Sequence, residues 1–117
     1  MEKEFIPYAL SLALKELGFD EECLGWYVSK TSQTLEIELV KQENLLRDAI
    51  IAPLYQQAFR WFREKDNLHQ VVLADEKGKY DIIVGERISG SCLGQYKTYE
   101  EAELECLKKL IEIVKEK

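Results

Sequence analysis

The sequence predicts an α+β fold in which three main helices pack on an antiparallel sheet. Three segments, near residues 7–17, 53–65 and 98–116, have the apolar spacing of amphipathic helices. Between them lie short alternating or β-branched segments joined by turn-forming residues, which is typical of hairpins. The connections are too short for parallel crossovers, so antiparallel pairing is expected. The predicted order is approximately α-β-β-(β)-α-β-β-β-α, where the strand in brackets is one of several alternatives.

The first helix is predicted from the segment "IPYALSLALKELG". Pro7 suits its first turn, because the missing N–H of a proline would be unpaired there, and Gly18 suits a left-handed end. An i, i+3, i+4, i+7 stripe is expected to face the core, formed by Leu10, Ala13, Leu14 and Leu17. Leu12 lies off this stripe, so it is either buried on a second side of the helix or in contact with another subunit.

A hairpin is predicted next, from "GWYV" and "LEIEL" with the turn-rich "SKTSQ" between them. Leu35, Ile37 and Leu39 alternate with polar residues, which indicates a strand with one buried and one solvent-facing side. Residues 41–51 are ambiguous between strand, helix and loop. Their last part, "DAII" ahead of Pro53, favours a short third strand, because a residue that precedes proline avoids helical angles.

The second helix, "APLYQQAFRWFREK", raises the question of whether its aromatic and cationic residues form a recognition surface. Pro53 is expected to mark its first turn. At 100° per residue, the apolar residues share one arc of about 160°. The cationic residues lie outside that arc and are not interleaved with the aromatics as on a base-stacking surface. We therefore interpret it as a core helix, with candidate contact residues on its polar side: Gln56, Gln57, Arg60 and Arg63.

A second group of strands follows this helix. Residues 71–73 and 82–84 are apolar and largely β-branched, and the "EKGK" between them is a turn with Gly78 at a position that needs positive φ. A loop rich in glycine then leads into a third strand through Cys92 and Tyr96.

The last helix is predicted from "TYEEAELECLKKLIEIVKEK". Thr98 and Glu101 match a capping box, acidic residues occupy the first turn and lysines the end, all of which suit the helix dipole. Glu100 and Glu103 belong to an acidic surface that a basic partner could use. Leu104 widens the apolar face, whose main residues are Ala102, Cys106, Leu107, Leu110, Ile111 and Val114.

The composition predicts one soluble domain over residues 1–117, with a C-terminal α-β-β-β-α unit at about 53–116. Of its residues, 46% are hydrophobic and 32% charged, and 16 basic against 22 acidic residues give a net charge of −6, which disfavours nucleic acid. Three cysteines without a Cys-x-x-Cys spacing suit a reducing compartment. No signal peptide or membrane span is expected, since no long apolar run occurs. A cytoplasmic location is predicted.

The sequence offers few candidate catalytic or metal-binding residues. "GSCLG" has the glycine spacing of a nucleophile elbow around Cys92, but the only histidine is His69 and a strand is predicted to follow. The acidic run Asp20, Glu21, Glu22 lacks the spacing that wraps a cation. No phosphate loop, zinc ribbon or paired carboxylates are found. We expect no enzyme, no cofactor and no metal, with cysteine chemistry at Cys92 as the single exception.

Parts of the sequence resemble two families of proteins. From Pro53 onward, the order of helix, three strands and helix resembles the double-stranded RNA-binding domain. The positions of that family's phosphate-binding lysines hold Tyr99, Glu100 and Glu103, so that chemistry is absent and its charge reversed. The stretches "FIPYALSLALKELGFDEECLGWY", "APLYQQAFRWFREK" and "KTYEEAELECLKKLIEIVK" resemble a family of small uncharacterised proteins of tailed phages and of prophages in gut bacteria. This resemblance implies a bacterial host cytoplasm and no particular reaction.

The function predicted from these observations is a non-enzymatic protein–protein interaction module of phage or prophage type. A small domain has little interior to bury its apolar surface, and such surface tends to be interface. The residues that contribute it are Leu12, Leu104, Ile113, Trp26, Trp61 and the six tyrosines. The partner is another protein or a second copy, and a homodimer is the commonest form of self-association. The alternative is a nucleic-acid-binding accessory protein that uses a local basic patch at Arg60 and Arg63.

Overall fold

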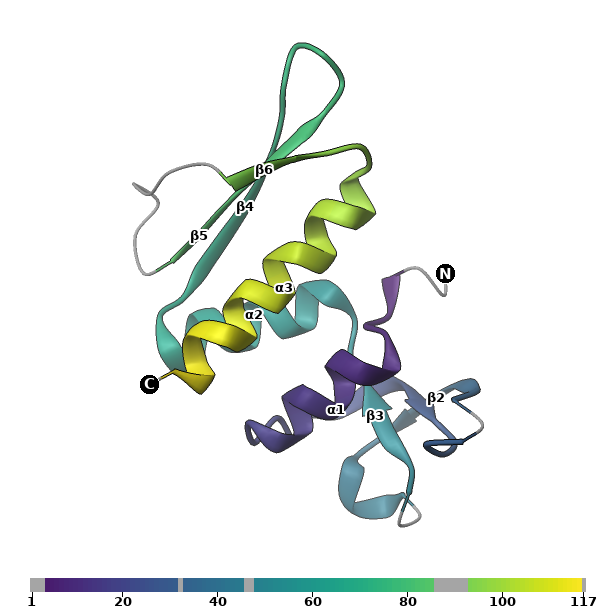
Figure 1. The fold of residues 1–117 in the computed structure, drawn as a ribbon. Coiled ribbons are helices and arrows are strands. Elements are labelled where there is room, and N and C mark those ends of the chain that lie inside the picture. Colours follow the sequence, from purple (N-terminus) through teal and green to yellow (C-terminus); the bar gives the residue numbers. More distant parts are fainter. Residues whose placement is uncertain (1–3, 32, 46–47, 86–92, 117) are drawn as a thin grey trace. The chain divides into compact units, whose positions relative to one another are not determined.

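The structure is a computed structural model that describes residues 4–31, 33–45, 48–85 and 93–116. These residues form three helices and two three-stranded antiparallel sheets (Figure 1), which confirms the predicted α+β class and order of elements. The chain divides into two compact units, Met1–Gln57 and Ala58–Lys117, each with its own sheet. That the chain as a whole is a single domain stays a prediction.

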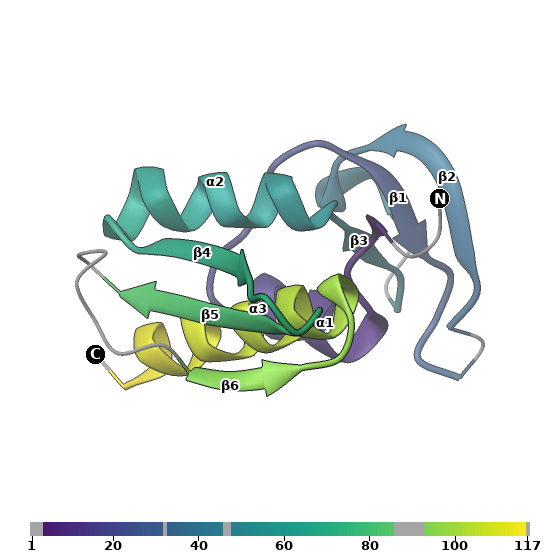
Figure 2. The same cartoon turned by 90° about the horizontal axis from the view of Figure 1, so that it is seen from above.

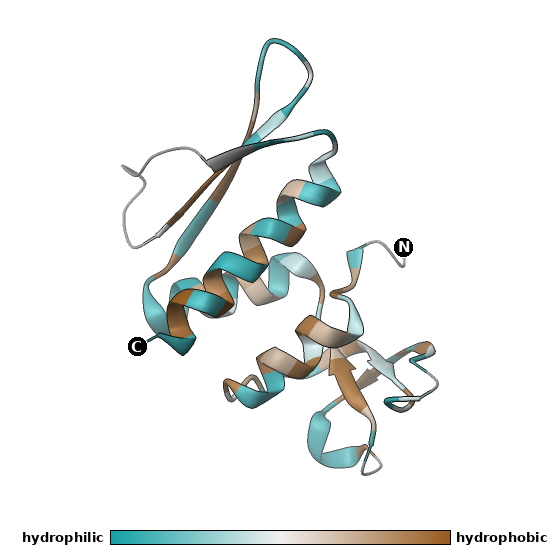
Figure 3. Ribbon diagram, viewed as in Figure 1, coloured by the Kyte–Doolittle hydropathy of each residue, from teal (hydrophilic) through white to brown (hydrophobic). Residues whose placement is uncertain are grey.

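The first unit is built around a sheet with the strand order β2-β1-β3. Its elements are α1 (Tyr8–Glu16), β1 (Cys23–Tyr27), β2 (Leu35–Val40), the 3-10 turn η2 (Gln42–Asn44) and β3 (Ile50–Ala52). The ambiguous residues 41–51 are thus a short turn followed by a strand, which confirms the third strand predicted from "DAII". Strand β3 is hydrophobic throughout (Figure 3) and buried, and α1 packs on it.

The ends of α1 follow the predicted residues with one difference. Pro7 is the N-cap, with extended backbone angles, so it precedes the first turn instead of lying within it. At the other end Gly18 has a φ of 99°, and the N–H of Phe19 donates to the carbonyl of Leu14 over 3.0 Å. This left-handed residue closes the helix as glycine allows, which confirms the predicted end.

The core of the first unit includes a buried cluster of Phe5, Tyr27 and Ala52. Gly25, in the middle of β1, faces the ring of Phe5, and a Cβ atom at this position would lie 2.7 Å from a carbon of that ring. Glycine is therefore required here so that an aromatic side chain can lie directly on the strand. The ring of Tyr8 meets that of Tyr27 edge to face at 5.6 Å between centroids, a favoured aromatic geometry.

The second unit contains a meander with the strand order β4-β5-β6 (Figure 2). Its strands are β4 (His69–Ala74), β5 (Tyr80–Gly85) and β6 (Leu93–Tyr96), and α3 (Tyr99–Lys115) packs on all three. The β4–β5 turn confirms the prediction for Gly78, which has a φ of 80°. The carboxylate of Asp75 accepts hydrogen bonds from the backbone N–H groups of Lys77 and Lys79, at 2.8 and 2.9 Å, and so fixes the turn.

Helix α2 (Tyr55–Asp66) runs through the division between the units and is a core helix, as predicted. Its buried residues are Tyr55, Ala58, Phe59, Trp61 and Phe62. Pro53 does not mark its first turn, because the helix begins two residues later. The helix ends at Asn67, which has a φ of 55°, while the N–H of Leu68 donates to the carbonyl of Phe62. Asn67 thus takes the left-handed position after the helix that glycine usually takes.

Helix α3 begins with half of the predicted capping box. The Thr98 side chain accepts from the N–H of Glu101 at 3.1 Å, but the Glu101 carboxylate accepts from the N–H of Lys97 and not from that of Thr98. The predicted apolar face is confirmed, since Ala102, Cys106, Leu107, Leu110 and Ile111 are all buried.

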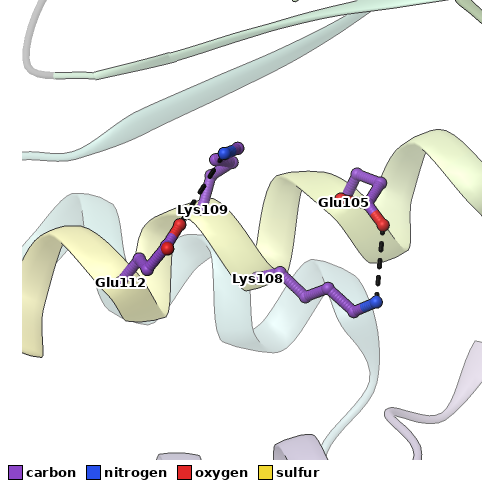
Figure 4. Close-up of polar contacts among 4 residues, drawn as sticks. All are labelled: Glu105, Lys108, Lys109 and Glu112. Carbon is purple, nitrogen blue, oxygen red and sulfur yellow. Dashed lines mark hydrogen bonds and ion pairs between the residues drawn. The ribbon is translucent and has the colours of Figure 1, made fainter. Parts of the chain in front are cut away.

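The outer side of α3 carries two ion pairs, Lys108–Glu105 at 3.4 Å and Lys109–Glu112 at 3.7 Å (Figure 4). Such exposed pairs stabilise a helix by only ~0.3–0.5 kcal/mol each. Among the helices formed by described residues, none is long and apolar enough to cross a membrane.

Candidate functional site

The two edges of the sheet in the first unit differ in how their backbone groups are satisfied. At the β3 edge, the side chain of Gln42 acts as a clamp. Its amide nitrogen donates to the carbonyl of Ala49 at 2.8 Å, and its oxygen accepts from the N–H of Ile51 at 3.0 Å. The N–H of Ile6 donates to the carbonyl of Pro53 next to this strand. This edge is therefore occupied by the chain itself.

The β2 edge is open. Over the described ranges, β2 pairs with β1 on one side and with no strand on the other. An edge strand presents a row of backbone N–H and C=O groups that can pair with another chain, and natural proteins usually shorten, cover or charge such edges. Strand β2 is six residues long, so it is not a short edge strand. It does carry charge, in the acidic side chains of Glu36 and Glu38.

A β-bulge lies at the end of this hairpin away from its turn, where β1 begins and β2 ends. Cys23 pairs with Val40 and Gly25 with Ile37, so two residues of β2, Glu38 and Leu39, lie opposite the single residue Leu24. A bulge of this kind breaks the strict alternation of side chains and increases the local twist. The pattern that the sequence predicted for Leu39 therefore does not continue to the end of the strand.

The prediction of a strand with one buried side is wrong for β2. Ile37 is 53% exposed and Leu39 is 60% exposed. The physical reason is the bulge together with the position of α1, which packs on β3 at the other edge of the sheet. Leu24 in the neighbouring strand β1 and Val28 directly after it are also exposed.

A cleft of about 400 Å³ lies beside this edge. Its walls come from the residue ahead of β1, from β1 itself, from the end of β2 and from η2. The lining residues are Glu22, Trp26, Glu38, Leu39, Val40, Lys41, Asn44 and Leu45. The residues that line the cleft thus include one tryptophan and three aliphatic residues together with two glutamates and one lysine.

Trp26 is the largest side chain of the cleft and is half-buried. It pairs with Glu36 on one neighbouring strand and Ile51 on the other, so it lies on the sheet face opposite to Gly25. Its indole Nε1 is occluded and has no hydrogen-bond partner among the described residues. An unsatisfied buried donor costs about 1–3 kcal/mol. The unpaired indole N–H therefore lowers the stability of the fold.

The acidic loop ahead of β1 is held in place by Gln57. The Gln57 amide nitrogen donates to the backbone carbonyl of Glu22 at 2.8 Å and to the carboxylate of Glu21 at 3.3 Å. Gln57 was predicted as a contact residue on the polar side of its helix. In the structure it is half-buried and positions the loop that carries Glu22 to the cleft.

The other predicted contact residues do not gather at this site. Leu12 and Leu104 are half-buried, and Trp61 is buried with 7% exposure. Glu100 is exposed at the start of α3, whereas Glu103 is buried and does not belong to an open acidic surface. Gln56, Arg60 and Arg63 are exposed on α2, and they are not among the residues that line the cleft.

The described cysteines are poor nucleophiles. Cys23 and Cys106 are buried, and burial raises the pKa of each thiol to about 12, with a further contribution from Glu21 at Cys23 and from Glu103 at Cys106. The residue predicted as the possible nucleophile, Cys92, lies outside the described residues. His69 opens β4 and its ring contacts the Asn67 side chain at 3.3 Å. The described part of the chain contains no group of three or more potential metal ligands.

The open edge and the cleft were not identified from sequence. The signal was present in "LEIELV", where apolar and acidic residues alternate, but alternation is also the pattern of an ordinary half-buried strand. Trp26 was predicted to lie in a strand and to add to the apolar surface of the domain, but it was not placed in a cleft. The chain matches no family model, no curated protein and no solved structure.

Proposed function

We propose that this chain is a non-enzymatic protein–protein interaction module that binds its partner through the open edge of β2. The observation that carries the proposal is the combination of exposed Ile37 and Leu39 with an outer edge of β2 to which no strand of the described residues is paired. Peptide segments commonly bind by adding a strand to such an edge, where main-chain hydrogen bonds supply affinity and side-chain pockets supply specificity.

The energetics favour occupation of this edge. Leaving a large aliphatic side chain in water forgoes about 1.5–3 kcal/mol relative to full burial. Ile37 and Leu39 are each more than half exposed, and they lie within three residues of each other on one strand. A strand added beside β2 would remove part of that surface from water and satisfy the outer backbone groups at the same time.

Self-association and the phage or prophage setting belong to this proposal as expectations from the sequence. A second copy is one protein that could occupy the edge, and a two-fold dimer is its commonest form. The setting in a bacterial host cytoplasm rests on the sequence resemblance alone. Nucleic-acid binding through Arg60 and Arg63 stays an alternative prediction.

The proposal is tested by placing a charge on the edge. Sedimentation velocity at roughly 1–100 µM, a range in which weak protein contacts are seen, shows whether the chain self-associates; if it does so through β2, Ile37→Lys should abolish the association. Leu73→Lys is the matched control, because Leu73 is an aliphatic residue of β4 with 43% exposure. Association that survives Ile37→Lys would show that a different surface is used. If the chain stays monomeric, its partner at β2 is another protein, and titration with a peptide tests that case.

A further inference from the structure

We propose that the partner of the β2 edge is an extended segment in which apolar and basic side chains alternate, with an arginine entering the Trp26 cleft. This inference rests on the proposed function and names the chemistry of its partner.

The two faces of β2 differ in character. Ile37 pairs with Gly25 and shares the face on which Phe5 lies, while Glu36 pairs with Trp26 on the opposite face. Side chains on an added strand would alternate between the same two faces. On the added strand, an aliphatic residue beside Ile37 and a basic residue beside Glu36 or Glu38 would stabilise the pairing most. Cross-strand pairs of these kinds stabilise a sheet.

The cleft supplies a place for one of the basic side chains. Trp26 offers an indole surface, and Glu22 and Glu38 are carboxylates on its walls, opposed by the single ammonium group of Lys41. A guanidinium group stacks on an indole and pairs with a carboxylate through two parallel hydrogen bonds, which an ammonium group cannot do. Cations over tryptophan gain about 0.5–2 kcal/mol, the larger values applying where water is excluded. Arginine therefore suits the cleft better than lysine.

A second copy of the chain is a less suitable occupant of this edge. If two β2 strands paired antiparallel about a two-fold axis at Ile37, Glu36 of one copy would lie opposite Glu38 of the other, and this pair would occur twice. Like charges directly opposite each other destabilise a sheet. The whole chain also carries a net charge of −6, so electrostatic attraction favours a basic partner over another copy.

The inference is tested by fluorescence anisotropy with a labelled six-residue peptide of alternating arginine and valine, titrated with the whole chain at physiological salt. Two other peptides serve as controls. One has glutamate in place of arginine, and the other keeps arginine but carries N-methyl groups on alternate residues, which removes the backbone donors of one strand edge. The first peptide should bind, and both controls should bind at least roughly tenfold more weakly, as expected when main-chain hydrogen bonds and charge pairs carry the affinity.

Two protein variants locate the binding. The double variant Glu36→Gln and Glu38→Gln should weaken binding of the arginine peptide roughly fivefold, because two cross-strand charge pairs are lost. The matched control changes Glu64 and Glu76 to glutamine, since both are exposed and lie in the second unit. Equal weakening by both double variants, or undiminished binding of the N-methylated peptide, would show that only diffuse charge attraction is measured and would overturn the inference.

The proposed function can fail separately. If no peptide binds but Ile37→Lys abolishes self-association, the basic partner is wrong and the interaction role stands with a second copy as occupant. If no peptide binds and Ile37→Lys changes nothing, both the inference and the proposed function are wrong.

Discussion

The hydroxyl group of Tyr27 donates a hydrogen bond of 2.7 Å to the backbone carbonyl of Ile6, 21 residues earlier in the chain. The same carbonyl accepts a second hydrogen bond, of 3.1 Å, from the hydroxyl of Ser11 in α1. All three residues are buried. One carbonyl oxygen therefore joins the N-terminal segment, the first helix and the central strand of the first sheet.

Replacing Tyr27 with phenylalanine removes the first of these bonds and leaves the ring in place. We expect the free energy of unfolding to fall by about 1 kcal/mol, because a typical buried hydrogen bond contributes this much. Thermal or urea unfolding measures the change. Tyr8→Phe is the matched control, since Tyr8 keeps its edge-to-face contact with Tyr27. Adding Ser11→Ala to Tyr27→Phe should cost more than the sum of the single changes, because the buried carbonyl then loses both partners. Strict additivity would contradict this shared role.

Replacing Gly25 with alanine should destabilise the first unit. The new methyl group would lie 2.7 Å from the Phe5 ring and 3.3 Å from Leu35, so the ring has to move. Overpacking of this kind typically costs about 1–3 kcal/mol. Shortening the ring residue by Phe5→Leu should recover part of the loss in the double variant, although it is destabilising alone. The two single changes in the free energy of unfolding can be summed to predict the stability of the double variant. If the double variant is no more stable than this sum, the clash is not the cause.

The buried thiols should make stability fall at alkaline pH. In the folded chain, burial raises the pKa of Cys23 and of Cys106 from the ordinary 9.0 to about 12. Below pH 9.0 both the folded and the unfolded chain keep these protons, so the stabilising contribution is complete. As the pH rises from 9.0 towards 12, the unfolded chain releases them first and the folded state loses stability. Urea midpoints measured across this range should fall less steeply in the variant with Cys23→Ser and Cys106→Ala than in the natural chain.

The same two thiols should be inert in the folded state at pH 8. With a pKa of about 12, the thiolate fraction is of the order of one in ten thousand, and the thiolate is the reactive form. Alkylation followed by peptide mapping should therefore modify Cys23 and Cys106 only in denaturant. Rapid modification of Cys106 without denaturant would contradict the burial of that residue on the inner side of α3.

Replacing Gln57 with alanine should loosen the acidic loop without unfolding the chain. The change removes the hydrogen bonds to the carbonyl of Glu22 and to the carboxylate of Glu21. We expect faster amide hydrogen exchange over residues 19–24 and weaker binding of the arginine peptide, because Glu22 is then less well positioned at the cleft. Gln56→Ala, at the exposed neighbouring position, should leave exchange in this loop unchanged. Equal effects of the two changes would contradict the positioning role of Gln57.

The sequence by itself determined the elements of this protein. Local signals act within a few residues. They predict the left-handed end at Gly18, the turn at Gly78, the cap at Thr98 and the aromatic face of α2, all of which the structure contains. Each depends on a backbone angle, a nearby hydrogen bond or a helical period, all of which are properties of the segment itself. The α+β class follows from the order of those segments.

Only the tertiary structure decided which apolar residues are buried and where a partner could bind. The alternation of "LEIELV" is the same whether the strand lies under a helix or at an open edge, so it could not distinguish a buried Ile37 from an exposed one. The bulge opposite Leu24, the clamp formed by Gln42 on β3 and the packing of α1 on that strand are contacts between segments. Because these contacts close one edge of the sheet and leave the other open, the candidate site depends on the packing of distant segments and not on any short motif.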